Sequence, residues 1–169
     1  MILYGTTHRV GDAISTEDII AAEQRAADDP AVLAAHCLAR IDAAIAERVR
    51  EGDLLLAGRG FGAGEACDAA VLTLQAVGFT AVICSSCAPS FDEAAQSYGL
   101  PVLVCPAAVA AIMAGSVVRL DLASGQIEDR ANGARYQAPP CAPALVDAVR
   151  RAALLTRMRR VVEEEGFDG

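Results

Sequence analysis

The sequence predicts an α/β domain with a mixed sheet flanked by helices, and two observations support that prediction. Short apolar runs, first at 53–57 and 80–84, alternate with helical patterns, which is typical of parallel strands covered by helices on both faces. Near the end of the chain, an Asn132-Gly133 pair is a turn signal typical of antiparallel strands. Because the composition shows no break, we expect a single domain over residues 1–169.

Residues 1–52 carry one predicted strand and three predicted helix starts. We expect the strand over 1–4, before a turn at Gly11-Asp12. A side chain that can accept a hydrogen bond from a free backbone N–H precedes each helix. The predicted starts are Thr16 before a short helix from 17, Asp29-Pro30 before a second helix, and Asp42 before a helix over 43–50.

From residue 53 onward, strands and helices alternate. Gly78, Gly99 and Gly115 each follow a helical pattern, as is common where helices end. A Ser124-Gly125 turn and the Asn132-Gly133 turn separate the last strands. In chain order we expect strand 53–57, helix 66–77, strand 80–84, helix 90–98, strand 101–105, helix 107–114, strands 116–122 and 126–130, and a last helix over about 144–165.

The stretch Gly58 to Ala70, GRGFGAGEACDAA, is the strongest candidate for a binding site. It follows an apolar strand, and its first seven residues include four glycines. Glycines lack a Cβ, so a ligand can approach the backbone, and they permit positive φ at little steric cost. Free N–H groups and the positive end of the following helix would attract a negative charge. We therefore expect a carboxylate or phosphate at residues 58–66, called the glycine turn below.

Composition and charge exclude several classes of function. A net charge of −8 would repel the phosphates of a nucleic acid. No apolar run reaches the roughly 18 residues that a membrane span needs, and the first residues lack the pattern of a secretion signal. The six cysteines fit free thiols in a reducing compartment. We expect a cytoplasmic protein that binds neither nucleic acid nor membrane.

Several motifs in one register resemble the small subunit of isopropylmalate isomerase (3-isopropylmalate dehydratase), the swivelling domain of the aconitase family. The family pattern G-D-D-I-D-T-D-x-I-I corresponds to residues 11–20, and the signature G-x-N-F-G-x-G-S-S-R-E-H-A to residues 58–70. The patterns A-V-I-x-x-S-F-A-R-I-F and G-L-P-V-L correspond to residues 81–91 and 99–103. The resemblance is strongest over 1–137 and implies a swivelling β/β/α domain.

The resemblance also implies a role in a hydro-lyase that dehydrates or isomerises a hydroxy-carboxylic acid. A large subunit is expected to hold a 4Fe-4S cluster, and no cofactor is expected on this chain. In the family, the first Ser of the signature is the base for a proton next to a carboxylate, and the Arg two places on clamps a substrate carboxylate. Here those positions are Glu65 and Cys67, and the Arg of A-R-I-F is Pro89.

Besides a self-contained thiol protein built on Cys67, Cys84 and Cys87, two functions therefore stay open. One is a hydro-lyase subunit of altered substrate, active only with a large subunit, with Glu65 and Cys67 as catalytic candidates. The other is a non-catalytic ligand-binding or regulatory subunit that kept the fold but lost the substrate-binding Ser and Arg. The candidates for substrate binding are Gly60, Phe61, Gly62, Gly64 and Ala66.

Each catalytic candidate also has a simpler interpretation. Glu65 could replace the serine as general base, or it could, with Asp68, merely complement the helix dipole. Cys67 could be a thiolate activated near a helix N-terminus, or a small packing residue.

Cys84-Ser85-Ser86-Cys87 has the spacing of a redox or metal-binding pair. Zinc would need two more ligands, for which Cys105 and Cys141 are candidates, and the alternative is buried thiols. The Cys84–Cys87 loop and the glycine turn lie at the carboxyl ends of adjacent predicted strands, where open α/β sheets bind ligands. His8 could also approach a ligand.

The last helix has a basic middle and an acidic end: Arg150, Arg151, Arg157, Arg159 and Arg160 precede Glu163 to Glu165. Because the whole chain is acidic, this pattern favours a solvated or subunit-contact helix over a nucleic-acid patch. An excess of small apolar residues also indicates an interface. We expect a large catalytic subunit of the aconitase family as partner, and a homo-oligomer when the chain is isolated.

Overall fold

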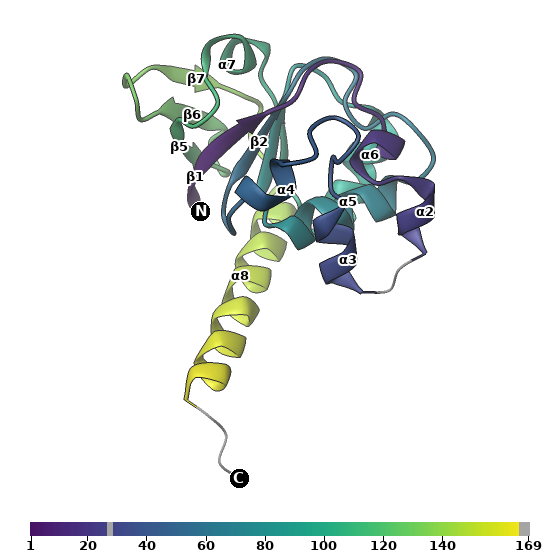
Figure 1. The fold of residues 1–169 in the computed structure, drawn as a ribbon. Coiled ribbons are helices and arrows are strands. Elements are labelled where there is room, and N and C mark those ends of the chain that lie inside the picture. Colours follow the sequence, from purple (N-terminus) through teal and green to yellow (C-terminus); the bar gives the residue numbers. More distant parts are fainter. Residues whose placement is uncertain (27–28, 166–169) are drawn as a thin grey trace.

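The computed structural model describes residues 1–26 and 29–165; residues 27, 28 and 166–169 of the predicted domain lie outside these ranges. A seven-stranded sheet has the strand order β4-β3-β2-β1-β5-β6-β7 (Figure 1). The strands are β1 (Ile2–Arg9), β2 (Leu54–Ala57), β3 (Ala81–Cys84), β4 (Val102–Val104), β5 (Val117–Asp121), β6 (Gln126–Asp129) and β7 (Arg135–Gln137). The helices are α1 (Thr16–Ile19), α2 (Ala22–Arg25), α3 (Pro30–Ala35), α4 (Ile45–Arg48), α5 (Cys67–Val77), α6 (Pro89–Ser97), α7 (Pro106–Ala111) and α8 (Pro143–Glu164).

Strand β1 divides the sheet into a parallel half and an antiparallel half. On one side β1, β2, β3 and β4 pair in parallel, in that order. On the other side β1 pairs antiparallel with β5, and β5, β6 and β7 form an antiparallel meander. The predicted mixed sheet flanked by helices is therefore confirmed.

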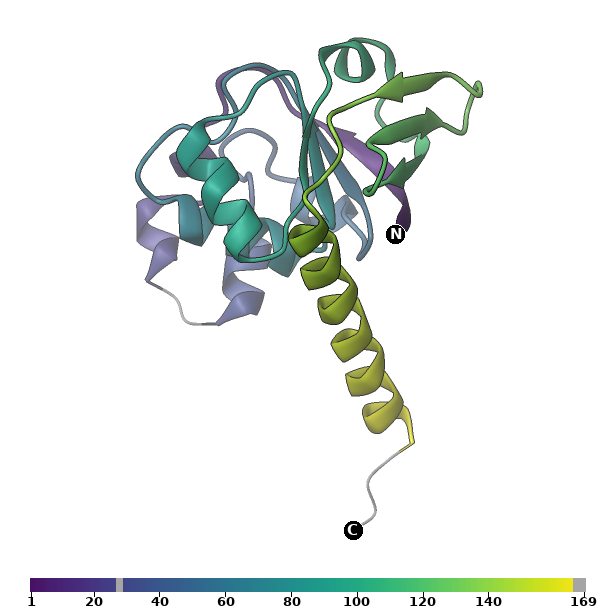
Figure 2. The ribbon, with the colours of Figure 1, turned by 180° about the vertical axis from the view of Figure 1, so that it is seen from behind.

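Both faces of the parallel half are covered, which explains why its strands are continuously apolar. Along β2, Leu55 and Ala57 pack in one core cluster with residues of α1, α4, α5 and α6. Leu54 and Leu56 point the other way, into a second cluster with β5, β6, α7 and the start of α8. Figure 2 shows the chain from behind, with α6 beside the parallel half of the sheet on the left and the antiparallel meander at the upper right.

Two predicted helix starts are wrong in their capping residue. The N-cap of α1 is Ser15 and not Thr16: Ser15 Oγ accepts a hydrogen bond from Asp18 N at 3.2 Å, and the Asp18 carboxylate accepts one from Ser15 N at 3.0 Å. Asp42 does accept a hydrogen bond from Ala44 N, but α4 begins only at Ile45, so the helix predicted over 43–50 is too long.

The remaining boundaries are closer to the prediction. Asp29 caps α3, because its carboxylate accepts a hydrogen bond from Ala31 N at 2.9 Å. Strand β1 runs on to Arg9 because residues beyond the predicted strand pair with β2, and α7 ends earlier than predicted, at Ala111. From β2 onward, the other predicted elements are confirmed to within one residue at each end. Helix α2 was not predicted.

Helix α8 begins on the body of the protein and then projects from it (Figures 1 and 2). Leu145, Val146 and Val149 are buried in the second core cluster, whereas residues 150–165 are all exposed. Among the described residues there is no helix whose length and apolar content would suffice to cross a membrane.

Candidate functional site

Three loops meet where β1, β2 and β3 end, near the top of Figure 1. They are residues 10–15, the glycine turn and residues 85–88. Parallel bridges join Ser15 to Ala63 and Phe61 to Cys87. The glycine turn therefore lies between the other two loops, as expected for loops that leave the carboxyl ends of neighbouring parallel strands.

In the first half of the glycine turn, the backbone N–H groups donate hydrogen bonds to other groups of the protein. The bonds run from Gly58 N to Gly11 O (3.1 Å), Arg59 N to Asp12 Oδ1 (2.8 Å), Gly60 N to Ser86 Oγ (2.8 Å), Phe61 N to Ser86 O (3.1 Å) and Gly62 N to Ile14 O (2.7 Å). These groups fix the conformation of the turn. The expectation that the glycine turn offers free N–H groups to an anion is therefore wrong for residues 58–62.

The second half of the turn differs. Within the described residues, the N–H groups of residues 63–69 donate to no other group of the protein. They include the first turn of α5, whose N-cap residue, Ala66, provides no side-chain cap. Unpaired N–H groups and the positive end of the helix dipole both favour a negative charge here. An anion would thus bind at residues 63–69 rather than across the whole turn.

Close packing beneath the turn explains two of its glycines. Gly62 has φ +84°, and a Cβ on it would lie 2.4 Å from Phe91 Cγ. The Phe91 ring in turn packs edge-on against Phe61, with ring centroids 5.1 Å apart. Gly64 has φ +134°, and its Cβ would lie 2.2 Å from the Thr16 hydroxyl oxygen, a buried atom with no hydrogen-bond partner in the described structure. Larger residues would push the turn off its support.

The two catalytic candidates, Glu65 and Cys67, lie in different environments. Glu65 is exposed and lies in the stretch whose N–H groups are unpaired. Cys67 is only 9% exposed, and its Sγ donates a hydrogen bond to Gly64 O at 3.5 Å. Burial, followed by the negative charges of Asp68 and Cys87, raises the pKa of the Cys67 thiol. This shift opposes the interpretation of Cys67 as an activated thiolate.

The predicted substrate-binding residues fall into two groups. Gly60, Phe61 and Gly62 have their N–H groups bonded within the protein, and the Phe61 side chain is buried. They shape the turn. Gly64 and Ala66 have unpaired N–H groups.

The Cys84–Cys87 pair forms a thiol contact. The side-chain interaction between the two thiols lowers the pKa of Cys87 and raises that of Cys84, while Cys87 Sγ donates a hydrogen bond to Ala88 O at 3.4 Å. All six cysteines are free. Cys105 and Cys141 do not complete a zinc site: across residues 1–26 and 29–165, no three His, Cys, Asp or Glu side chains are grouped so that they could hold a metal ion.

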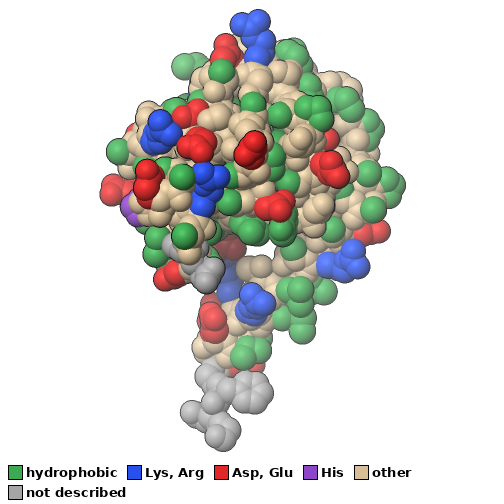
Figure 3. Space-filling view, turned by 90° about the vertical axis from the view of Figure 1, so that its right-hand side faces the viewer, with side chains coloured by type: hydrophobic (Ala, Val, Ile, Leu, Met, Phe, Trp, Pro, Cys, Tyr) green, Lys and Arg blue, Asp and Glu red, His purple; other side chains and the backbone are tan. Residues whose placement is uncertain are grey.

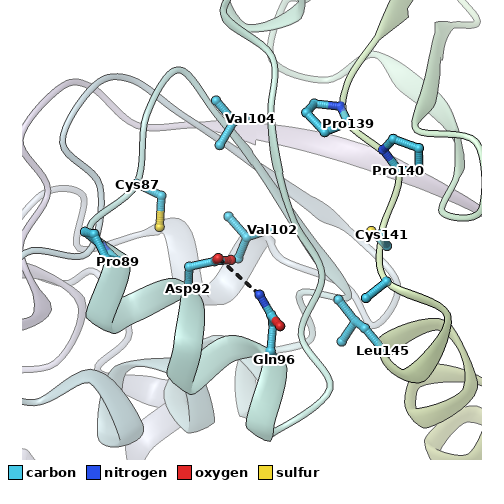
Figure 4. Close-up of a pocket in the computed structure, with 11 residues that line it drawn as sticks. Cys87, Pro89, Asp92, Gln96, Val102, Val104, Pro139, Pro140, Cys141 and Leu145 are labelled. Atoms are coloured by element: carbon cyan, nitrogen blue, oxygen red, sulfur yellow. Dashed lines mark hydrogen bonds between the residues drawn. The ribbon is translucent and has the colours of Figure 1, made fainter.

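Cys87 also lines a cavity of about 390 Å³ between α6 and residues 139–145 (Figure 4). Asp92 and Cys141 face the same cavity, and Asp92 Oδ2 accepts a hydrogen bond from Gln96 Nε2 at 3.1 Å. Of the described residues that line it, Asp92 is the only charged one. A carboxylate ligand would be repelled there, so the glycine turn is the better anion site.

His8 does not face a ligand: its Nε2 lies 2.7 Å from Asp53 Oδ2, and its ring packs edge-on against Phe79. Two cations near the loops were missed in the sequence. Arg9 donates to the carbonyl oxygens of Val109 and Ile112 in α7 and the residue that follows it, whereas the Arg59 side chain is 81% exposed and lies 3.7 Å from Asp12 Oδ2. Arg59 occupies the first variable position of the signature, which gave no signal of its own.

The mixed sheet and the glycine turn between two loops agree with the resemblance seen in the motifs, and comparisons with known proteins test it. No protein-family profile matches the chain. The chain is 34% identical over 163 residues to the 3-isopropylmalate dehydratase small subunit of Moorella thermoacetica, covering 96% of this chain and 98% of that protein. It is 41% identical over 133 residues to the 2,3-dimethylmalate dehydratase small subunit of Eubacterium barkeri, covering 79% and 82%.

The fold agrees with these sequence relatives. The crystal structure of 3-isopropylmalate dehydratase from Methanocaldococcus jannaschii matches with a TM-score of 0.80 and 29% identity, over 94% of this chain and 99% of that one. The chain therefore belongs to the family of 3-isopropylmalate dehydratase small subunits, which are subunits of aconitase-family hydro-lyases. The resemblance seen in the motifs is confirmed.

Proposed function

We propose that this chain, joined to a large subunit, forms one wall of the substrate pocket of a hydro-lyase for a substituted malate. Two of its relatives are named for such substrates, 3-isopropylmalate and 2,3-dimethylmalate. The observation that carries the proposal is the row of unpaired N–H groups at residues 63–69. We also propose that the complex is cytoplasmic, because six free thiols remain reduced in that compartment.

In this proposal backbone donors take over the role of the family's arginine. A substrate carboxylate accepts hydrogen bonds from the N–H groups around Gly64 and Ala66, at the start of α5. Arg59, the one cationic residue of the glycine turn, is largely exposed and would bind a second carboxylate. The bonds from Gly60, Phe61 and Gly62 keep these donors in place, so the turn is ordered before substrate arrives.

Glu65 is the proposed general base. Its carboxylate would accept the proton from the carbon next to the substrate carboxylate, the step that the family assigns to a serine at this position. Closure of the large subunit over the exposed Glu65 would exclude water from that step. The large subunit is proposed to carry the 4Fe-4S cluster, which supplies a Lewis acid for the substrate hydroxyl. Cys67 then packs behind the turn and takes no proton.

The test is an anaerobic co-purification of this chain with its large subunit, followed by assays with 3-isopropylmalate and 2,3-dimethylmalate. Glu65→Gln should lower kcat by roughly a hundredfold, the usual range for a lost general base, with KM changed little. The matched control is Asp68→Asn, a neighbouring exposed acid that should keep most of the activity.

Two results would count against the proposal. A stable complex that carries the cluster but turns over neither substrate would favour the non-catalytic regulatory subunit. Equal losses in Glu65→Gln and Asp68→Asn would mean that the turn needs acidic charge, and that Glu65 is not the base.

A further inference from the structure

Two thiols that the proposed function does not use, Cys84 and Cys87, are brought together by the fold. Cys84 is the last residue of β3, and the chain bends at Ser85 before Cys87 forms a parallel bridge with Phe61. Cys84 is buried in the first core cluster, Cys87 packs against the same cluster, and the two side chains interact. The two sulfurs therefore meet in the folded protein without any rearrangement of the domain.

The short loop between the two cysteines is fixed by backbone hydrogen bonds on both sides. The bonds run from Ser85 N to Ala57 O (3.2 Å), Phe61 N to Ser86 O (3.1 Å), Ala88 N to Phe61 O (2.9 Å) and Cys105 N to Cys84 O (2.9 Å). Because the loop is ordered in advance, a reaction between the two sulfurs is an intramolecular step that loses little conformational freedom. Proximity thus favours a disulfide between these two thiols over one with a distant cysteine.

Of the two thiols, Cys87 is the one that a small molecule can reach. Cys87 is partly buried and lines the cavity of about 390 Å³ between α6 and residues 139–145. Figure 4 shows its side chain at the wall of this cavity, beside Pro89 and Asp92. Cys84 is fully buried and does not line the cavity. A molecule that enters the cavity therefore meets Cys87 first.

The surroundings of Cys87 also favour its ionised form, which is the nucleophile. The interaction with Cys84 is the largest influence and lowers the pKa of the Cys87 thiol; burial and the Asp92 carboxylate act against this, and the backbone N–H of Asp92 acts with it. Burial is the main influence on the Cys67 and Cys141 thiols, and it raises the pKa of both. Cys87 is therefore the best nucleophile of these three thiols.

The walls of the cavity admit a small uncharged oxidant better than an anionic one. Asp92 is the one charged side chain among the described residues that line it, and Val102, Val104 and Pro139 are apolar. Negative side chains are also spread over the body of the protein in Figure 3, as expected from the net charge of −8. Hydrogen peroxide carries no charge, whereas glutathione disulfide is anionic and would be repelled.

We propose that Cys84 and Cys87 form an oxidation site for small hydroperoxides, at which Cys87 reacts first and Cys84 then closes a reversible disulfide. A reactive cysteine that is accessible and lies beside a second thiol is the arrangement typical of redox-sensitive sites. This inference goes beyond the proposed function and does not depend on it, because the reaction needs neither the substrate nor the large subunit.

The reaction has two steps. The Cys87 sulfur attacks a peroxide oxygen and the O–O bond breaks, which gives a sulfenic acid on Cys87 and an alcohol, or water when the oxidant is hydrogen peroxide. The Cys84 sulfur then attacks the Cys87 sulfur, the S–O bond breaks, and hydroxide leaves with the Cys84 proton as water. In total the two thiols lose two electrons and two protons, and the peroxide takes up both.

The first test treats the reduced full chain with hydrogen peroxide, unfolds it, alkylates the remaining thiols and analyses chymotryptic peptides by mass spectrometry. The peptide 80–91 contains Cys84 and Cys87 and no other cysteine. We expect this peptide to lose two hydrogen atoms and both alkylation sites, and to regain them after treatment with dithiothreitol. Cys37 is the control: burial raises its pKa to about 12, so it should remain a thiol.

Three results of this test would overturn the proposal. They are a peptide 80–91 that stays reduced, a disulfide from Cys87 to Cys67 or Cys141, and oxidation of Cys37 as fast as that of Cys87. Since this test uses the wild-type chain, it does not depend on the folding of any variant.

The second test checks the order of the two steps. In Cys84→Ser, peroxide should leave Cys87 as a sulfenic acid that dimedone traps, and the disulfide should be lost. In the matched variant Cys87→Ser, the buried Cys84 should give no dimedone adduct. An adduct on Cys84 there, or none on Cys87 in Cys84→Ser, would contradict the proposed order.

The third test replaces hydrogen peroxide with glutathione disulfide at the same concentration. We expect much slower formation of a mixed disulfide on Cys87, because Asp92 and the acidic surface repel the anion. Equal rates with the two reagents would show that the cavity does not select an uncharged oxidant, and would overturn the assignment to hydroperoxides.

Discussion

The glycine turn and the end of α8 both expose groups that a partner could cover, but the two kinds of group differ. In the glycine turn, residues 58–62 are already bonded to two neighbouring loops, and only the N–H groups of residues 63–69 are left. Along α8 the backbone groups are hydrogen-bonded within the helix, and the groups that remain exposed to a partner are apolar side chains between Leu154 and Val162. The first surface offers hydrogen-bond donors, and the second offers exposed apolar side chains.

The two regions should also differ in how firmly the rest of the protein holds them. The turn rests on buried aromatic side chains of the first core cluster, so it should unfold only with the domain. Among the residues that the structure describes, the end of α8 has one ion pair to the body, through Arg160, and it should be able to fray locally.

The largest effect is expected for Gly62→Ala. The new Cβ would meet the buried Phe91 ring at 2.4 Å, and the residue would have to keep φ at +84°. Overpacking and a left-handed backbone together should cost about 3 kcal/mol of unfolding free energy. Chemical denaturation of the full chain measures this cost.

Gly60→Ala is the control for that substitution. Gly60 also has a positive φ, +70°, but the nearest atom to its added Cβ is 3.9 Å away. It should cost only about 1 kcal/mol, the backbone strain alone. Equal costs at Gly60 and Gly62 would show that the turn does not rest on Phe91.

A smaller effect is expected at Cys87, whose loop supports the turn. The Cys84 side chain lowers the pKa of the Cys87 thiol, which favours the thiolate form, the form that reacts with iodoacetamide. Removing the Cys84 thiol in Cys84→Ala should raise the pKa of Cys87 and slow its alkylation at neutral pH, because a smaller fraction of Cys87 is then thiolate.

Mass spectrometry of the alkylated peptides measures this rate between pH 6 and 9, and the wild-type rate should begin to rise at lower pH than the variant's. Cys84→Ser keeps a hydrogen-bond donor and should react faster than Cys84→Ala. Identical rates for wild type and Cys84→Ala would show that the two sulfurs do not interact.

Much of the fold could be predicted because its signals are local. Apolar runs and glycines in consecutive residues mark each strand and helix from β2 onward. Where two neighbouring polar residues could serve as a cap, the local signal was insufficient: both Ser15 and Thr16 can cap a helix, and only the contact between Ser15 and Asp18 decides. Helix α4 is short for a similar reason, since Asp42 bonds to a residue that stays outside the helix.

The site was less predictable because its bonds are distant in sequence. The glycine turn was recognised from its own residues, but the partners of its N–H groups lie in the loops at 10–15 and 85–88. No local pattern shows that Ser86 and Ile14 use the donors of Gly60 and Gly62. The same holds for Cys67, whose burial depends on the packing of α5 against the sheet and not on its place near a helix start.

The smallest effect is expected where α8 contacts the body through charge. Glu51 and Arg160 form an ion pair, but their side chains are 59% and 57% exposed, so water and salt screen it. Glu51→Gln should change the unfolding free energy by less than about 0.5 kcal/mol and leave the helix content unchanged by circular dichroism. Glu93→Gln, at an exposed acid of α6, is the control for loss of one negative charge. If Glu51→Gln instead removes helix signal from dilute protein, the ion pair holds α8 in place, and the contrast between a turn fixed by many internal bonds and a helix end held by few is wrong.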